Sequence, residues 1–144
     1  MASGYKPNFA VYTVTASTTL DPFFAGATVA LNAAAGLTIT LPAATGSGAS
    51  YEIVARTTVT SNSYIIKVAN SSDVMMGVLA VASDIAGVTC PTTSTSDTIT
   101  MNGTTTGGIL GSRVMLQDVA ANKWAVSGAL VASGVEATPF SATV

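Results

Sequence analysis

The residue types that most often carry enzyme chemistry are scarce in this chain. Histidine is absent, which removes the commonest general base and metal ligand. Cys90 is the sole cysteine, and without a histidine to activate it the thiol is not expected to act as a nucleophile. We therefore predict a protein that is not an enzyme and that needs neither a cofactor nor a metal.

The acidic residues and the glycine-rich stretch do not change this prediction. The carboxylates are far apart in the sequence, and they form neither a calcium loop nor an obvious pair of the kind that glycosidases use. The glycines of Gly46–Ser50 do not complete a phosphate-binding loop, because no Lys-Ser/Thr follows and a strand is expected next. The carboxylates are Asp21, Glu52, Asp73, Asp84, Asp97, Asp118 and Glu136.

The basic residues predict no direct contact with nucleic acid, because phosphate binding needs a clustered positive patch. Those of this chain are scattered: Lys6, Arg56, Lys67, Arg113 and Lys123. No apolar run of about 18 residues predicts a membrane span. The first ten residues lack the apolar region of a secretory signal, and a lone cysteine fits synthesis in a reducing cytosol.

The low charge of the chain favours a protein whose surface is partly covered by partners. Charged residues make up 8% of the sequence and apolar residues 49%, with a formal net charge of -2. Ordinary domains carry roughly 25% charged residues. Because interface cores are depleted of charge, we favour a covered surface. The alternative is a neutral surface coated with Thr and Ser.

The stretch from Gly36 to Arg56 organises the expected fold. Leu37, Ile39 and Leu41 alternate with threonines, and Tyr51 and Ile53 alternate with more polar residues after a Gly/Ser-rich loop. Period-2 alternation is typical of strands with one buried face. We expect two antiparallel strands with a shared apolar face, completed by strands from the rest of the chain.

Further strands are expected on both sides of this unit. Short segments rich in β-formers occur at residues 11–15, 27–31, 63–69 and 98–101, and a closing hairpin joins 109–118 to 123–127. Residues 74–82 can form a strand or a helix, and the surroundings favour a strand. The expected core residues are Leu37, Ile39, Leu41, Ile53, Ile66, Trp124 and Val126.

These patterns predict an all-β fold, a single domain over residues 1–144 built as an antiparallel β-sandwich or a small β-barrel with long Thr/Gly-rich loops. Residues 1–10 are expected to form an arm, in which Tyr5 and Phe9 can anchor in a partner's groove and are the candidate contacts with a capsid. Residues 133–144 are expected to be extended. Trp124 is expected in the core, with sugar stacking as its alternative role.

Three parts of the sequence resemble the head decoration, or cement, proteins of tailed bacteriophages. They are Val29-Ala30-Leu31 running through GLTITLP, the YEIV and SYIIKVAN segments, and the closing GSRVMLQDVAANKWAVSG, which together cover about residues 27–128. The sequence departs from many of these proteins in its Thr-rich insert, residues 89–107.

The resemblance implies a structural protein that binds the outer surface of a phage head and stabilises the shell by bridging capsomers. It implies that the partners are the major capsid protein and further copies of the chain, as a homotrimer. It places the protein on the virion surface after synthesis in the host cytoplasm. The alternative is a tail-fibre or adhesin-like module that binds a cell-surface glycan through Tyr, Trp and Asn/Asp on exposed loops.

Overall fold

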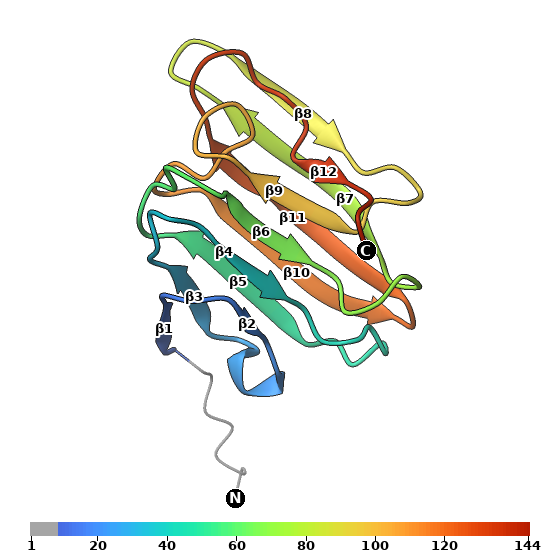
Figure 1. Ribbon diagram of the computed structural model, residues 1–144. Coiled ribbons are helices and arrows are strands. Elements are labelled where there is room, and N and C mark those ends of the chain that lie inside the picture. The colour runs from blue at the N-terminus through green and yellow to red at the C-terminus, as the bar shows by residue number, and fades with distance from the viewer. Residues whose placement is uncertain (1–8) are drawn as a thin grey trace, which may run out of the picture.

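Two β-sheets pack face to face in the computed structural model, which describes residues 9–144 (Figure 1). The strands are β1 (Val11–Val14), β2 (Thr18–Thr19), β3 (Thr28–Leu31), β4 (Leu37–Thr40), β5 (Ser50–Ala55), β6 (Tyr64–Lys67), β7 (Val74–Ala82), β8 (Gly87–Pro91), β9 (Thr98–Met101), β10 (Arg113–Ala120), β11 (Lys123–Val131) and β12 (Phe140–Ser141). A single 3-10 turn, η1 (Pro22–Phe24), is the only helical element among the described residues. The predicted all-β sandwich is confirmed.

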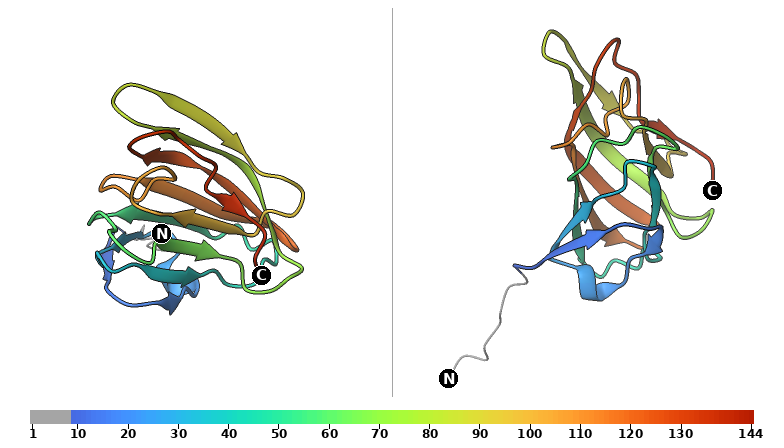
Figure 2. Two further views of the ribbon diagram at one scale, coloured as in Figure 1. Left: turned by 45° about the horizontal axis from the view of Figure 1, so that its top comes forward. Right: turned by 60° about the vertical axis from the view of Figure 1, so that its left-hand side comes forward.

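The two sheets differ in size. The larger sheet has seven strands in the order β1-β3-β5-β10-β11-β7-β8, and the smaller has five in the order β12-β9-β6-β4-β2. Through β6 the chain alternates between them, so that β1, β3 and β5 are parallel neighbours in one sheet and β2, β4 and β6 in the other. The two layers are seen edge-on in the right-hand view of Figure 2.

This alternation corrects the expected pairing of the organising stretch. The strands β4 and β5 do not form an antiparallel pair, because β4 lies in the smaller sheet and β5 in the larger. Their apolar faces meet across the core instead, which explains why both show the same alternation. The expectation of antiparallel pairing throughout is likewise wrong, because both sheets are mixed.

The segment of undecided structure, residues 74–82, is the strand β7. It pairs in parallel with β11 and antiparallel with β8. The strand β8 was not expected, because it lies at the start of the Thr-rich insert and contains Pro91. Since proline lacks a backbone N–H, an edge strand is the position in a sheet that tolerates it, and β8 is the edge of the larger sheet.

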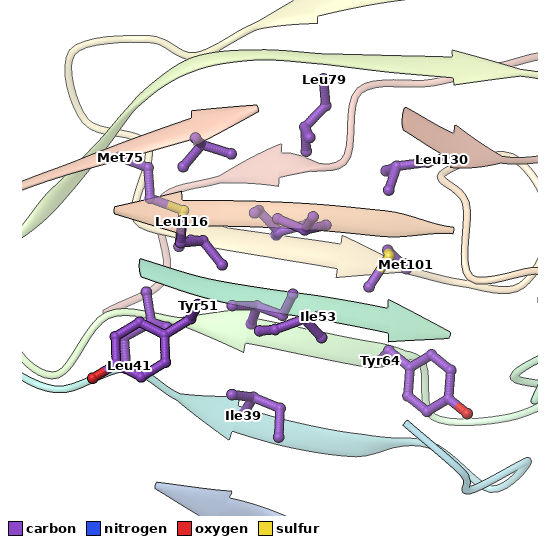
Figure 3. Packing of buried hydrophobic residues seen from close by; sticks show 14 of the residues in the cluster. Ile39, Leu41, Tyr51, Ile53, Tyr64, Met75, Leu79, Met101, Leu116 and Leu130 are labelled. Atoms are coloured by element: carbon purple, nitrogen blue, oxygen red, sulfur yellow. The ribbon is translucent and has the colours of Figure 1, made fainter. Parts of the chain in front are cut away.

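The core lies between the two sheets and is built from alternate residues of their strands (Figure 3). Ile39 and Leu41 from the smaller sheet face Tyr51, Ile53 and Leu116 from the larger sheet, and all five are buried. The two adjacent phenylalanines of η1 differ in burial, since Phe24 packs against the core and Phe23 is exposed.

Candidate interaction surfaces

Within residues 9–144 the side chains form no obvious catalytic or metal-binding group. No three His, Cys, Asp or Glu side chains in this part of the chain lie close enough together to hold a metal ion. The same residues include no helix with the length and apolarity needed to cross a bilayer. The features that remain are buried carboxylates, an apolar sheet face and a groove between the sheets.

Asp118, near the end of β10, holds the loop that joins β4 to β5. Its carboxylate accepts hydrogen bonds from the backbone N–H groups of Thr45, Gly46 and Ser47, with Gly46 the closest at 2.6 Å. The Ser47 hydroxyl donates a further bond of 2.7 Å to Oδ2. Because its oxygens are occupied by the protein's own donors, Asp118 serves as a structural clamp rather than a free acid.

The hydrogen bonds to Asp118 also determine its charge state. Burial alone raises the pKa of this carboxyl, but the bonds from Ser47, Thr45 and Gly46 favour the ionised form and outweigh burial, so the pKa falls to about 2. Asp118 is therefore negatively charged at neutral pH although its side chain is buried.

Two further buried carboxylates have the same structural role. Asp73 accepts bonds of 2.9 Å from the backbone N–H of Ala44 and from the Asn122 side-chain amide. Asp97 accepts a bond from the backbone N–H of Thr143 at 2.8 Å. The latter bond fastens the C-terminal segment to the smaller sheet. Each carboxylate joins segments that are distant in the sequence.

The outward face of the larger sheet carries an unusual number of apolar side chains. Register places Met115 on β10 beside Ser127 on β11, which lies beside Val78 on β7. Met76 and Met115 are 44% and 43% exposed, and Val78 and Val131 are also exposed. We call this surface, over β10, β11 and β7, the outer face.

The outer face carries a few charged side chains and a shallow depression. Arg113 and Glu52 form an ion pair with each other, and Lys123 lies where β11 begins. A depression of about 190 Å³ lies between the side chains of Met115, Gln117 and Ala125. A surface with exposed apolar side chains and a small depression is suited to a partner that inserts an apolar side chain.

A larger groove of about 500 Å³ lies where the larger sheet extends beyond the smaller one. We call it the edge groove, and β8 forms one wall and β12 with its flanking residues the other. Glu136 is its only charged lining residue among the described residues. The lining residues are Val88, Thr89, Cys90, Pro91, Thr93, Thr95, Ser96, Glu136, Thr138, Phe140, Ser141 and Ala142.

Trp124 lies in the core, where only 1% of the residue is exposed. Its ring centroid lies 5.9 Å from that of Tyr51, in a tilted arrangement. The indole Nε1 is buried and has no hydrogen-bond partner among the described residues. A ring this deeply buried offers no face on which a sugar could stack, so the alternative role for Trp124 is not supported.

The other residues singled out in the sequence divide into core and surface. All seven expected core residues, Leu37, Ile39, Leu41, Ile53, Ile66, Trp124 and Val126, are buried in one cluster. Phe9 is 87% exposed, whereas Tyr5 lies outside the described residues. The prediction for Phe9 and Tyr5 as contacts of an N-terminal arm is therefore left untested.

Sequence reasoning missed the outer face and the edge groove. The sequence did contain a signal for the outer face. Val114 and Leu116 face the core, so Met115 between them is an apolar residue on the outward side of β10. The edge groove had no such signal, since it depends on how far one sheet extends beyond the other. Comparison of the chain with family models, curated proteins and solved structures finds no match in any of the three.

Proposed function

We propose that this protein is a capsid decoration protein that binds the outer surface of a phage head and stabilises the shell by bridging capsomers. The observation that carries the proposal is the outer face, a sheet surface over three strands with exposed Met76, Val78 and Met115. Such a face suits permanent attachment to another protein better than it suits exposure to solvent. The resemblance of residues 27–128 to cement proteins gives the kind of partner.

The mechanism requires binding and no catalysis. A protein that binds only the assembled shell stabilises that shell by mass action. Repetition of the same contact over the head adds avidity without any change in the single contact. In this proposal the partners are the major capsid protein and further copies of the chain in a homotrimer, and the protein resides on the virion surface.

The N-terminal segment, residues 1–10, is proposed as a second contact of the assembled layer, in which Tyr5 and Phe9 reach a neighbouring chain. The 87% exposure of Phe9 supports this role, since the ring has little contact with its own domain. Ordering such a segment costs conformational entropy, so each single contact is weak and repetition makes it useful.

The test is binding to empty, expanded heads. Met115→Glu places a charge on the β10 strand of the outer face and should weaken attachment at least tenfold, because an unpaired charge would be buried at the interface. Thr40→Glu is the matched control, on a strand of the smaller sheet, and should bind like the wild type. Failure of the wild-type protein to bind heads would refute the proposal and favour the tail-fibre interpretation.

A further inference from the structure

The edge groove exists because the smaller sheet ends before the larger one does. Its last strand, β12, has two residues, and β8 lies beyond it at the top of the view in Figure 1. Val88 is paired with the buried Val81 and yet remains 41% exposed, since no strand of the smaller sheet covers it. The sandwich therefore has room for one more strand opposite β8.

The free edge of β12 can bind such a strand. The backbone carbonyls of Pro139 and Ser141 accept hydrogen bonds from the neighbouring strand β9 and the residue before it, at 2.8 and 3.0 Å. Because bonding groups alternate along a strand, the carbonyl of Phe140 points away from β9, while its N–H donates to the Thr138 hydroxyl at 3.3 Å. Extended peptides commonly bind by adding to a sheet edge of this kind.

We propose that residues 1–8 of a second copy of this chain bind in the edge groove as a strand added beside β12. The chemistry of the two surfaces is complementary. Lys6 is the only charged side chain in the segment MASGYKPN, and Glu136 is the only charged side chain found to line the groove. Tyr5, next to Lys6, supplies a ring for the apolar space between Val88 and Phe140.

The occupant must come from another copy, because Tyr5 and Lys6 cannot reach the groove of their own domain. The strands β1 and β8 are the opposite edges of the seven-stranded sheet, six strand spacings apart, or about 29 Å at roughly 4.8 Å per spacing. The four residues from Phe9 back to Tyr5 span at most about 14 Å. Tyr5 therefore falls well short of the groove in its own domain.

This geometry also determines the kind of assembly. The strand β1, which follows the donor segment in the sequence, and the edge strand β8 lie at opposite ends of the larger sheet, so the contact is head-to-tail. Head-to-tail contacts form a ring when the rotation between copies closes, and a ring of three is the homotrimer of the proposed function. The inference goes beyond that function, because it assigns the N-terminal segment to another copy and needs no capsid.

A pair of introduced cysteines provides a direct test. Val88 lines the groove and is 41% exposed, whereas Cys90 is buried, so in a Cys90→Ser background Tyr5→Cys together with Val88→Cys should form an intermolecular disulfide under mild oxidation by copper–phenanthroline. We expect covalent dimers and trimers on a non-reducing gel. In the same background Tyr5→Cys together with Ser61→Cys, on an exposed turn, should not give the covalent trimer.

A charge exchange tests the same contact without covalent chemistry. Lys6→Glu alone and Glu136→Lys alone should each weaken self-association about two- to fivefold, as expected for a solvent-exposed ion pair. The double variant should recover the wild-type association measured by sedimentation velocity. If Tyr5→Cys and Val88→Cys form no cross-link, or if the double charge variant associates no better than the single ones, the proposal is wrong. Neither experiment contains heads, so either failure leaves the capsid proposal standing.

Discussion

Asp118 accepts a hydrogen bond of 2.6 Å from the backbone N–H of Gly46, and this bond joins the end of β10 to the loop that crosses between the two sheets. The loop carries the chain from β4 in the smaller sheet to β5 in the larger. Gly46 has a φ of +80°, a conformation that glycine adopts without strain. The hydrogen bonds to Asp118 therefore hold the loop through which the chain passes from the smaller sheet to the larger one.

Removing the charge of Asp118 should destabilise the fold. In Asp118→Asn the amide nitrogen replaces one acceptor oxygen, so backbone donors of residues 45–47 lose partners. We expect a loss of roughly 2 to 4 kcal/mol in the free energy of unfolding at pH 7, measured by urea denaturation. Asp84→Asn, at an exposed acid, is the matched control and should change stability little.

The same clamp predicts a pH dependence. The pKa of Asp118 in the folded protein is about 2, below its ordinary value of 3.8, so its stabilisation is fully present above about pH 4 and is lost as the pH falls through 2. The stability difference between wild type and Asp118→Asn should therefore shrink from pH 4 to pH 2. A difference that stays constant over this range would show that the carboxylate charge does not matter.

Trp124 should be one of the most costly core residues to truncate. Its side chain packs beside Tyr51 between the sheets, and Trp124→Ala would leave a large cavity. We expect a loss of about 3 to 5 kcal/mol, measured from the denaturation midpoint. Trp124→Phe, which keeps a ring but removes the unpaired N–H, should cost less. An unchanged midpoint in Trp124→Ala would contradict the described core.

Gly77 should be intolerant of any side chain. It has a φ of +150° within β7, and a Cβ atom built there would lie 1.9 Å from the carbonyl oxygen of Val126 on the neighbouring strand. Gly77→Ala should therefore destabilise the sheet by several kcal/mol, because backbone must move. Gly48→Ala is the control, since its Cβ would meet nothing within 4 Å and only the backbone strain of about 1 kcal/mol remains. Equal costs for the two variants would rule out the close approach as the cause.

Alternation predicted where strands lie but not which strands pair. The pattern of Leu37, Ile39 and Leu41 indicates a strand with one buried face, and that is what β4 is. The same pattern cannot say whether the next strand lies beside it or opposite it, because both arrangements bury the same residues. Pairing depends on the path of the connecting loop, which here is held by the distant Asp118.

The candidate surfaces were less predictable than the core. The outer face depends on residues from three strands that are brought together by register, such as Met115 and Val78. The edge strand β8 is short, with only Val88 and Cys90 as alternating apolar residues, and it ends in a proline. The low overall charge did suggest a covered surface, but composition has no information on where that surface lies.

The N-terminal segment should contribute to attachment but not to the stability of the domain. Deleting residues 2–9 removes the segment that we assign to the edge groove of a neighbouring copy, and it leaves every described strand intact. Attachment to heads should weaken because copies lose their contacts with each other, and light scattering should show a monomer where the full chain is a trimer. At a dilution where the full chain is also monomeric, both proteins should have the same melting temperature. Contacts between copies then no longer contribute to the stability of either protein. A truncated protein that still forms trimers and decorates heads with full affinity would show that the segment has no such role.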